Sequence, residues 1–205
     1  MKRKFAVLTV LGALLALAVP ASSMASMSPA AHQFEISGNS PKLGTSLGSC
    51  TITKISGTIP ASPANETETV FPISTPTVGT CTSGTTLTLG GTWNFGGINY
   101  LVHLGGAAAT LTMKFSSLPN CKLSSTNPGL YGVWSNGAAT PKLLKSSYHA
   151  HSASALTWSN DGGTCASAGK TETLTWSAEG SGIATASTVT DLTSPTSVVV
   201  VGANK

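Results

Sequence analysis

Apolar and polar residues alternate with a period of two along most of the chain after residue 45. Leucine and aromatic side chains occupy odd positions over 87–95, with threonines between them, and 111–115 repeats the pattern. Such alternation is typical of a strand with one buried face. The apolar positions over 98–104 change phase, which predicts a hairpin turn at Gly96-Gly97. Outside the first 25 residues, no window has the spacing of an amphipathic helix.

Shorter apolar runs predict further strands on both sides of this central region. They lie at 50–59, 68–73, 156–158, 174–178 and 198–201. Residues 124–150 interrupt the pattern with repeated turn signals, so we expect a long loop there with one short strand around 131–134. Long loops in compact domains often carry function, and we expect specificity to be determined here.

Many short strands separated by frequent turn signals predict an all-β fold. We expect an antiparallel β-sandwich, Ig-like or jelly-roll, with two disulfides, formed by a single domain over 46–202. Residues 26–45 are polar and contain proline, and we expect them to be a flexible N-terminal segment. The strand order does not follow from the sequence.

The first 25 residues have the pattern of a secretory signal peptide. Three positive charges at 2–4 precede an apolar run over 5–19 and a small-residue region that ends at Ala25. We expect cleavage after Ser23-Met24-Ala25, with Val19-Pro20-Ala21 as the alternative. The apolar run is shorter than the ~20 residues of a membrane span, so no transmembrane helix is expected. The pattern predicts a secreted protein, free in the medium or associated with the cell wall.

The charge of the chain argues against a nucleic-acid partner. Three of the eleven Lys and Arg residues lie in the predicted signal peptide, which leaves eight lysines against seven acids. Arg3 is the sole arginine, and arginine is the preferred residue for bidentate recognition of phosphates and bases. No basic patch indicates a nucleic-acid footprint.

Four cysteines in an exported protein predict two disulfides. Three connectivities are possible. We favour Cys50–Cys81 and Cys121–Cys165, because sequential pairing closes the shortest loops. A metal site is not expected, since no C-x-x-C occurs and no histidine lies near a cysteine in the sequence.

Motifs for catalysis are weak in this chain. Gly44-Thr45-Ser46-Leu47-Gly48 matches G-x-S-x-G, but no strand–helix alternation surrounds it, so we interpret it as a loop. The seven acids include no pair that a motif selects for glycoside hydrolysis. No cofactor is expected.

Four residues in or beside the irregular region are candidate ligand-binding residues: Tyr131, Trp134, His149 and His151. His149 and His151 share one face if the segment is extended. Trp93, Trp158 and Trp176 lie in phase with leucines and are expected in the core. Trp134 is the tryptophan expected to face solvent.

Two stretches carry a resemblance: 48–60, with the sequence GSCTITKISGTIP, and 78–93, which contains VGTC and GTW. They resemble small secreted Ser/Thr/Gly-rich β proteins of actinobacteria that have no assigned function. The resemblance implies export and a disulfide between Cys50 and Cys81. It implies no catalytic residue.

The sequence therefore predicts an exported, non-enzymatic binding or structural protein. Its expected ligand is a glycan, the cell wall or another protein. One alternative is a secreted hydrolase with a dispersed site built from His103, His149, His151 and an acid. Another is a self-assembling surface protein that uses threonine-rich faces or the 198–201 strand. The sequence does not indicate an oligomeric state.

Overall fold

The computed structural model of this 205-residue chain describes residues 25–61, 69–98, 100–137, 145–177 and 186–203. The predicted signal peptide lies outside these residues except for Ala25. The described residues form strands and turns without an α-helix, which confirms the all-β prediction. They include no helix of a length and hydropathy that would cross a membrane.

The strands follow one another in short segments along the chain. They are β1 (Ala25–Ser28), β2 (Gln33–Ser37), β3 (Lys42–Thr45), β4 (Gly48–Thr58), β5 (Thr69–Ile73), β6 (Thr77–Cys81), β7 (Thr85–Gly91), β8 (Trp93–Ile98), β9 (Leu101–Gly105), β10 (Ala109–Phe115), β11 (Cys121–Ser125), β12 (Gly129–Ser135), β13 (Ser147–Ala153), β14 (Ala155–Asn160), β15 (Thr171–Thr173), β16 (Thr175–Ser177), β17 (Ser187–Asp191) and β18 (Val200–Ala203).

Eight of these strands form a closed antiparallel barrel. Their order is β4-β2-β17-β13-β12-β9-β8-β5, and β5 returns to β4 through the pair Gly57↔Ile73. The predicted β-sandwich is therefore wrong. Alternation along a strand determines which face is buried, but it does not determine whether the first and last strands of a sheet meet.

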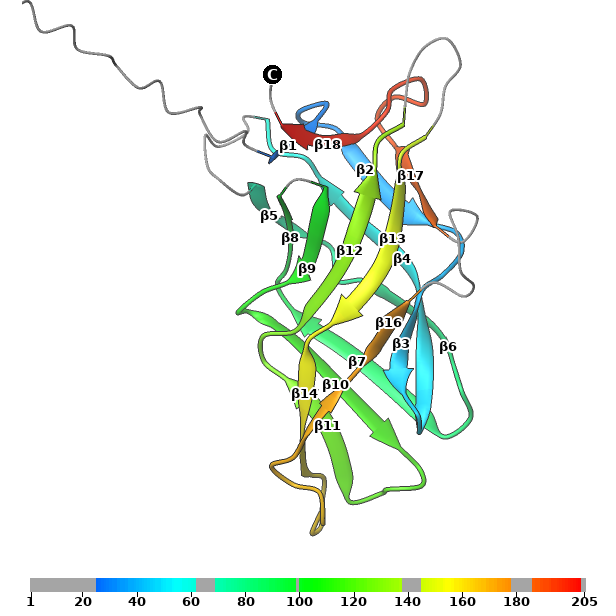
Figure 1. Ribbon diagram of the computed structural model, residues 1–205, viewed down its shortest axis with the longest axis vertical. Coiled ribbons are helices and arrows are strands. Elements are labelled where there is room, and N and C mark those ends of the chain that lie inside the picture. The colour runs from blue at the N-terminus through cyan, green and yellow to red at the C-terminus, as the bar shows by residue number, and fades with distance from the viewer. Residues whose placement is uncertain (1–24, 62–68, 99, 138–144, 178–185, 204–205) are drawn as a thin grey trace, which may run out of the picture.

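A second, five-stranded sheet continues the barrel, with the order β15-β14-β11-β10-β7. Each of four barrel strands connects directly to one strand of this sheet: β8 to β7, β9 to β10, β12 to β11 and β13 to β14 (Figure 1). At these connections the chain uses glycines with positive φ, +72° at Gly91 and +140° at Gly105. A Cβ on Gly105 would overlap the carbonyl oxygen of Pro128, so the close approach at this connection requires glycine.

The first half of β4 extends beyond the barrel, where β4 and β6 contact β7 of the five-stranded sheet. It pairs with β3 and β6, and β3 pairs in turn with β16. The Cys50–Cys81 disulfide joins β4 to β6, and Cys121–Cys165 joins the start of β11 to the segment before β15. Both favoured pairings are confirmed.

Aromatic side chains fill the interior of the barrel. Phe34 and Phe71 lie edge to face with ring centroids 6.2 Å apart, and Phe71 stacks on Phe95 at 5.2 Å. Trp93 and Trp176 are also almost completely buried, and Trp158 is buried in the five-stranded sheet, as expected from their phase. The buried residues of the two regions form one continuous core.

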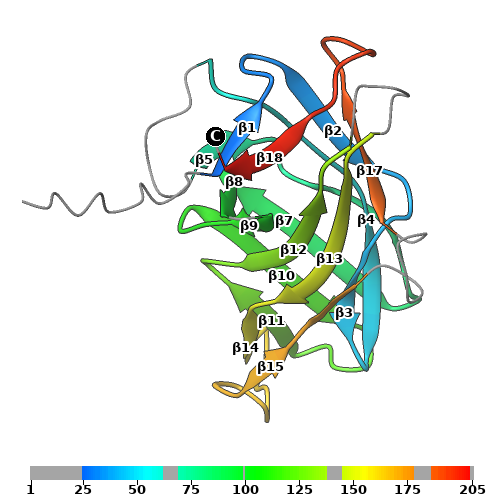
Figure 2. The same ribbon diagram turned by 45° about the horizontal axis from the view of Figure 1, so that its top comes forward.

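Residues 26–45, for which polar composition predicts a flexible segment, contribute most of β1 and all of β2 and β3. Phe34 and Ile36 are buried on either side of the half-buried Glu35, an alternation too short to stand out in the sequence. β1 pairs with β18, the strand predicted around 198–201, and this ribbon lies close to β5, β8 and β12 at one end of the barrel (Figure 2).

Two further predictions are wrong, namely the long loop at 124–150 and the hairpin turn at Gly96-Gly97. Residues 129–135 and 147–153 are β12 and β13, two adjacent strands of the barrel wall. Gly96 and Gly97 lie within β8, which runs on to Ile98. Glycine-rich sequence resembles turn sequence, but here the residues pair across β8 with β5 and β9.

Candidate functional site

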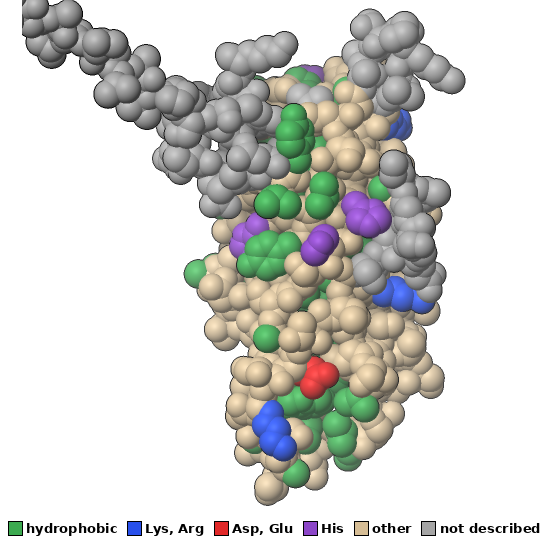
Figure 3. Space-filling model, viewed as in Figure 1, with side chains coloured by type: hydrophobic (Ala, Val, Ile, Leu, Met, Phe, Trp, Pro, Cys, Tyr) green, Lys and Arg blue, Asp and Glu red, His purple; other side chains and the backbone are tan. Residues whose placement is uncertain are grey.

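One outer face of the barrel carries an unusual group of side chains for this chain. We call it the histidine–aromatic face, and it consists of Leu101 and His103 on β9, Tyr131 and Val133 on β12, and His149 and His151 on β13. Leu101 is 63% exposed, Tyr131 45% and Val133 37%. Figure 3 shows hydrophobic and histidine side chains gathered at mid-height over the strands that Figure 1 places in front.

Strand register brings these residues together. One row of outward-facing residues crosses three adjacent strands and contains Leu101, Val133 and His149. In the next row of outward-facing residues along these strands, His103 lies opposite Tyr131. The residues between the two rows, such as Val102 and Ala150, point into the core. Because antiparallel pairing places opposite residues side by side, the face is a direct product of the register.

A β-bulge in β13 determines where His151 lies. The pairing shifts between Tyr131 and Gly132, so that Gly132 pairs with Ala150 and Tyr131 with Ser152. His151 is the extra residue, and both His151 and Ser152 are exposed. Bulges are common beside functional sites, where they redirect a side chain. Alternation along β13 already puts His149 and His151 on the same side of the barrel, and the bulge leaves His151 unpaired beside Tyr131.

The Tyr131 ring is held in a defined position. It stacks on the His103 ring with centroids 4.9 Å apart and an interplanar angle of 20°. A Cβ placed on Gly129, two residues earlier, would come within 2.8 Å of the Tyr131 hydroxyl oxygen, so the ring extends over this glycine. The two rings therefore form a preformed surface on rigid strands.

The structure brings together three of the four predicted ligand-binding residues, namely Tyr131, His149 and His151. Trp134 does not join them, and the expectation that it faces solvent is wrong. Its side chain is 1% exposed and lies edge to face with Phe95, with centroids 6.0 Å apart. Because side chains alternate along β12, Trp134 points inward while Tyr131 and Val133 point outward.

Leu101 and Val133 are members of the face that the sequence patterns did not single out. The available signal was their phase, since each is an apolar residue at a position where the alternation of its own strand calls for a polar one. His103 belongs to the hydrolase alternative, and the structure places it half-buried on the outer side. Among the described residues, no three His, Cys, Asp or Glu side chains are grouped as a metal site would require.

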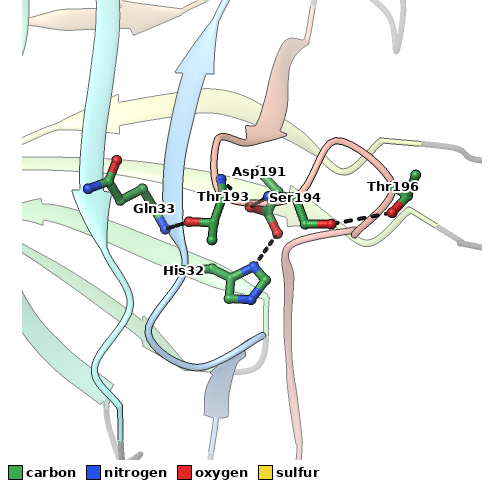
Figure 4. A network of polar contacts seen from close by, with 6 residues as sticks. All are labelled: His32, Gln33, Asp191, Thr193, Ser194 and Thr196. Atoms are coloured by element: carbon green, nitrogen blue, oxygen red, sulfur yellow. Dashed lines mark hydrogen bonds and ion pairs between the residues drawn. The ribbon is translucent and has the colours of Figure 1, made fainter.

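A second polar cluster lies at the rim of the barrel (Figure 4). His32 donates through Nδ1 to Asp191 at 2.7 Å, and the backbone N–H groups of Thr193 and Ser194 donate to the other carboxylate oxygen at 2.8 and 2.9 Å. Gln33 N–H donates to the hydroxyl of Thr193. The cluster joins the turn between β1 and β2 to the segment between β17 and β18. It therefore fixes the two segments that lead to the β1–β18 ribbon relative to each other.

Burial of the Asp191 carboxylate, whose side chain is inaccessible to solvent, acts to raise its pKa. Hydrogen bonds from the Ser194 backbone, the His32 ring and the Thr193 backbone outweigh this effect and hold the pKa below its ordinary value. The contacts around this carboxylate are those of a structural joint between two loops.

The G-x-S-x-G match lies in the hairpin between β3 and β4. Ser46 is exposed in the turn, and β4 rather than a helix follows it. A nucleophile elbow requires a strand followed by a helix, so this serine lacks that geometry.

No protein-family model matches the chain, and neither a curated protein nor a solved structure shows significant similarity to it. The functional argument therefore depends on the residues of the histidine–aromatic face.

Proposed function

We propose that this protein is an exported, non-enzymatic binding protein, and that its histidine–aromatic face binds a carbohydrate. The observation that carries the proposal is the stacked His103–Tyr131 pair on β9 and β12, in which Tyr131 is exposed beside Leu101 and Val133. Grouped apolar side chains on a protein surface mark interaction sites more often than scattered ones do.

The chemistry of the face suits a sugar ring. An aromatic ring and aliphatic side chains supply flat apolar area for the C–H face of a pyranose, and Tyr and His supply polar groups for its hydroxyls. The stacked rings and the β-strand backbone are already ordered, so binding loses little conformational entropy. An open face on a barrel wall also remains accessible to a polymer, which an enclosed pocket would not.

Export is supported by two features. The two disulfides fit an oxidising compartment. The charged, apolar and small-residue regions of the first 25 residues fit a signal peptide. We expect the secreted protein to begin at Ser26, and N-terminal sequencing of protein recovered from the medium tests this directly.

Co-sedimentation with insoluble peptidoglycan, cellulose and chitin tests the binding proposal. We expect saturable binding to at least one of them, and we expect Tyr131→Ala to weaken it about tenfold or more, because stacking area is lost. Leu192→Ala is the matched control, since Leu192 is 50% exposed but lies after β17 and away from the face. Binding that is absent for all three polymers, or equally weakened by both variants, would contradict the proposal. Capture of a protein by this face would instead assign it to a protein ligand.

The hydrolase alternative gains less support. Its three histidines do gather on one face, but β9, β12 and β13 contain no Asp or Glu to act with them. Glycoside hydrolysis generally uses two carboxylates on either side of the bond that is broken.

A further inference from the structure

The ionisable side chains on the three strands of the histidine–aromatic face are histidines and tyrosines, without acids, lysines or arginines. β9, β12 and β13 together contain His103, His149 and His151, and none of the three strands contains Asp, Glu, Lys or Arg. Elsewhere some of the described lysines pair with acids, such as Lys54 with Glu35 at 2.6 Å and Lys114 with Asp161 at 2.7 Å. The only ionisable groups of the face, apart from the Tyr131 phenol, are therefore imidazoles.

The strands that pack against β9, β12 and β13 add no exposed negative charge to the face. On the β8 side, the sequence Trp-Asn-Phe-Gly-Gly-Ile has no charged residue. On the β17 side, the Asp191 carboxylate is buried at the rim and bound to His32. Lys145, just before β13, contacts the hydroxyl of Thr190 at 3.2 Å and adds positive charge only. β16 and β18, which also contact β13 and β12, contain no charged residue. The described acids of the adjoining five-stranded sheet are Glu172 on β15 and Asp161, which pairs with Lys114. None of the six residues of the face itself is a carboxylate.

We propose that the carbohydrate recognised by this face is a polysaccharide that bears carboxylates, and that binding tightens as the pH falls from 8 to 5. This inference rests on the proposed carbohydrate-binding function. Histidine is the side chain that ordinarily gains its charge in this range. Protonated imidazole donates from both nitrogens, and charge-assisted hydrogen bonds to carboxylates are stronger than neutral ones.

The arrangement of the face suits a linear chain. Leu101, Val133 and His149 form a row across three neighbouring strands, which are spaced about 4.8 Å apart. The second row, His103 and Tyr131, lies parallel to it, and His151, the unpaired residue of the bulge in β13, lies between the two rows. A polymer lying across the strands would stack sugars on Tyr131 and bring its carboxylates to the imidazoles on either side.

The test compares polygalacturonate with its fully methyl-esterified form, which has the same backbone without the negative charge. We expect wild-type protein to bind polygalacturonate about tenfold more tightly at pH 5 than at pH 8, since each exposed ion pair contributes modestly. Binding of the methyl ester is expected to change little with pH. The gain at pH 5 is also expected to fall as salt is added.

Two variants separate this inference from the proposed function. The double variant His149→Gln, His151→Gln is expected to lose most of the pH effect while retaining binding of the neutral polymer. Lys170→Gln, which removes one positive charge before β15, is expected to retain the pH effect. Binding of both polymers that is lost in Tyr131→Ala but independent of pH would overturn this inference alone. Wild-type protein that binds neither polymer nor the insoluble glycans would overturn both.

Discussion

The outer face of the barrel and the outer face of the five-stranded sheet are built on the same runs of chain, yet they carry different side chains. β9, β12 and β13 expose leucine, valine, tyrosine and histidine. Their continuations β10, β11 and β14 place threonine, serine and lysine outward, for example Thr112, Ser124 and Thr157. The inward residues of both regions are apolar and belong to one core.

This difference shows that folding constrains the side chains at inward positions more than those at outward positions. Burial requires apolar side chains at inward positions in both regions, and both have them. Outward positions are free to be polar, and in the five-stranded sheet they are hydroxyl-rich as a solvated strand face should be. Exposed apolar and histidine side chains on the barrel are therefore the departure that calls for a functional explanation.

Replacing Trp134, which points inward from β12, should have the largest effect on stability. Trp134→Ala removes a ring that is 1% exposed and in contact with Phe95, so we expect a loss of about 3–5 kcal/mol in unfolding free energy. Tyr131→Ala, three positions earlier on the outer side, should change stability by about 0.5 kcal/mol or less. Urea denaturation measures both, and equal losses would contradict the assignment of the two faces.

Removing a disulfide distinguishes the two regions in another way. Replacing both Cys121 and Cys165 by alanine removes a link across 44 residues, for which we expect a loss of about 3–4 kcal/mol. Hydrogen exchange should increase most in β11, β14 and β15, and least in β9 and β12. Uniform acceleration across both regions would show that the core unfolds as a single unit.

The Asp191 cluster at the rim predicts a dependence of stability on pH. Because the folded pKa of Asp191 lies below the ordinary value of 3.8, its contribution is fully present above that value and is lost as the pH falls through the folded pKa. Asp191→Asn should lower stability by about 2 kcal/mol at pH 7 and flatten the acid side of the stability profile. Glu172→Gln, which removes an acid of β15 outside this cluster, is the control. Parallel profiles for wild type and Asp191→Asn would contradict the prediction.

The smallest effect is expected on the five-stranded sheet. The hydrogen bond and charge of Lys114 hold the pKa of Asp161 below its ordinary value, although the pair is open to solvent. Lys114→Ala should raise the pKa of Asp161 toward that value, as measured by NMR titration, with little change in thermal stability. A marked loss of stability would mean that this surface contributes more to the fold than its exposure indicates.

Several features of the fold could be predicted from local sequence. The alternation of Leu111, Met113 and Phe115 predicted a strand with one buried face, and β10 has that pattern. The spacing of the cysteines favoured the two disulfides that form. Local signals were misleading at Gly96-Gly97, where glycines lie inside a strand, and over 124–150, where turn residues separate two strands of the barrel wall.

The candidate site was predicted only in part. Tyr131, His149 and His151 were selected because they lie in or beside an irregular stretch, and because His149 and His151 share one face of an extended segment. The two histidines do share a face of β13, and the register of β12 with β13 places Tyr131 beside them. Trp134 was assigned the wrong side because the alternation of β12 was hidden by its glycines. Leu101 and His103 enter the site through β9, and they lie 28 or more residues before Tyr131 in the sequence, so local pattern carries no information on this pairing.

By itself, the sequence determined the class of secondary structure and the buried face of most strands, and it favoured the disulfide pairing that forms. These depend on neighbouring residues and on the small number of ways to pair four cysteines. Only the tertiary structure decided that eight strands close into a barrel, that five others continue it, and that six side chains from three strands share one outer face. Strand order and register are set by contacts between distant segments, and a shift of one residue would have turned every side chain of a strand to the opposite face.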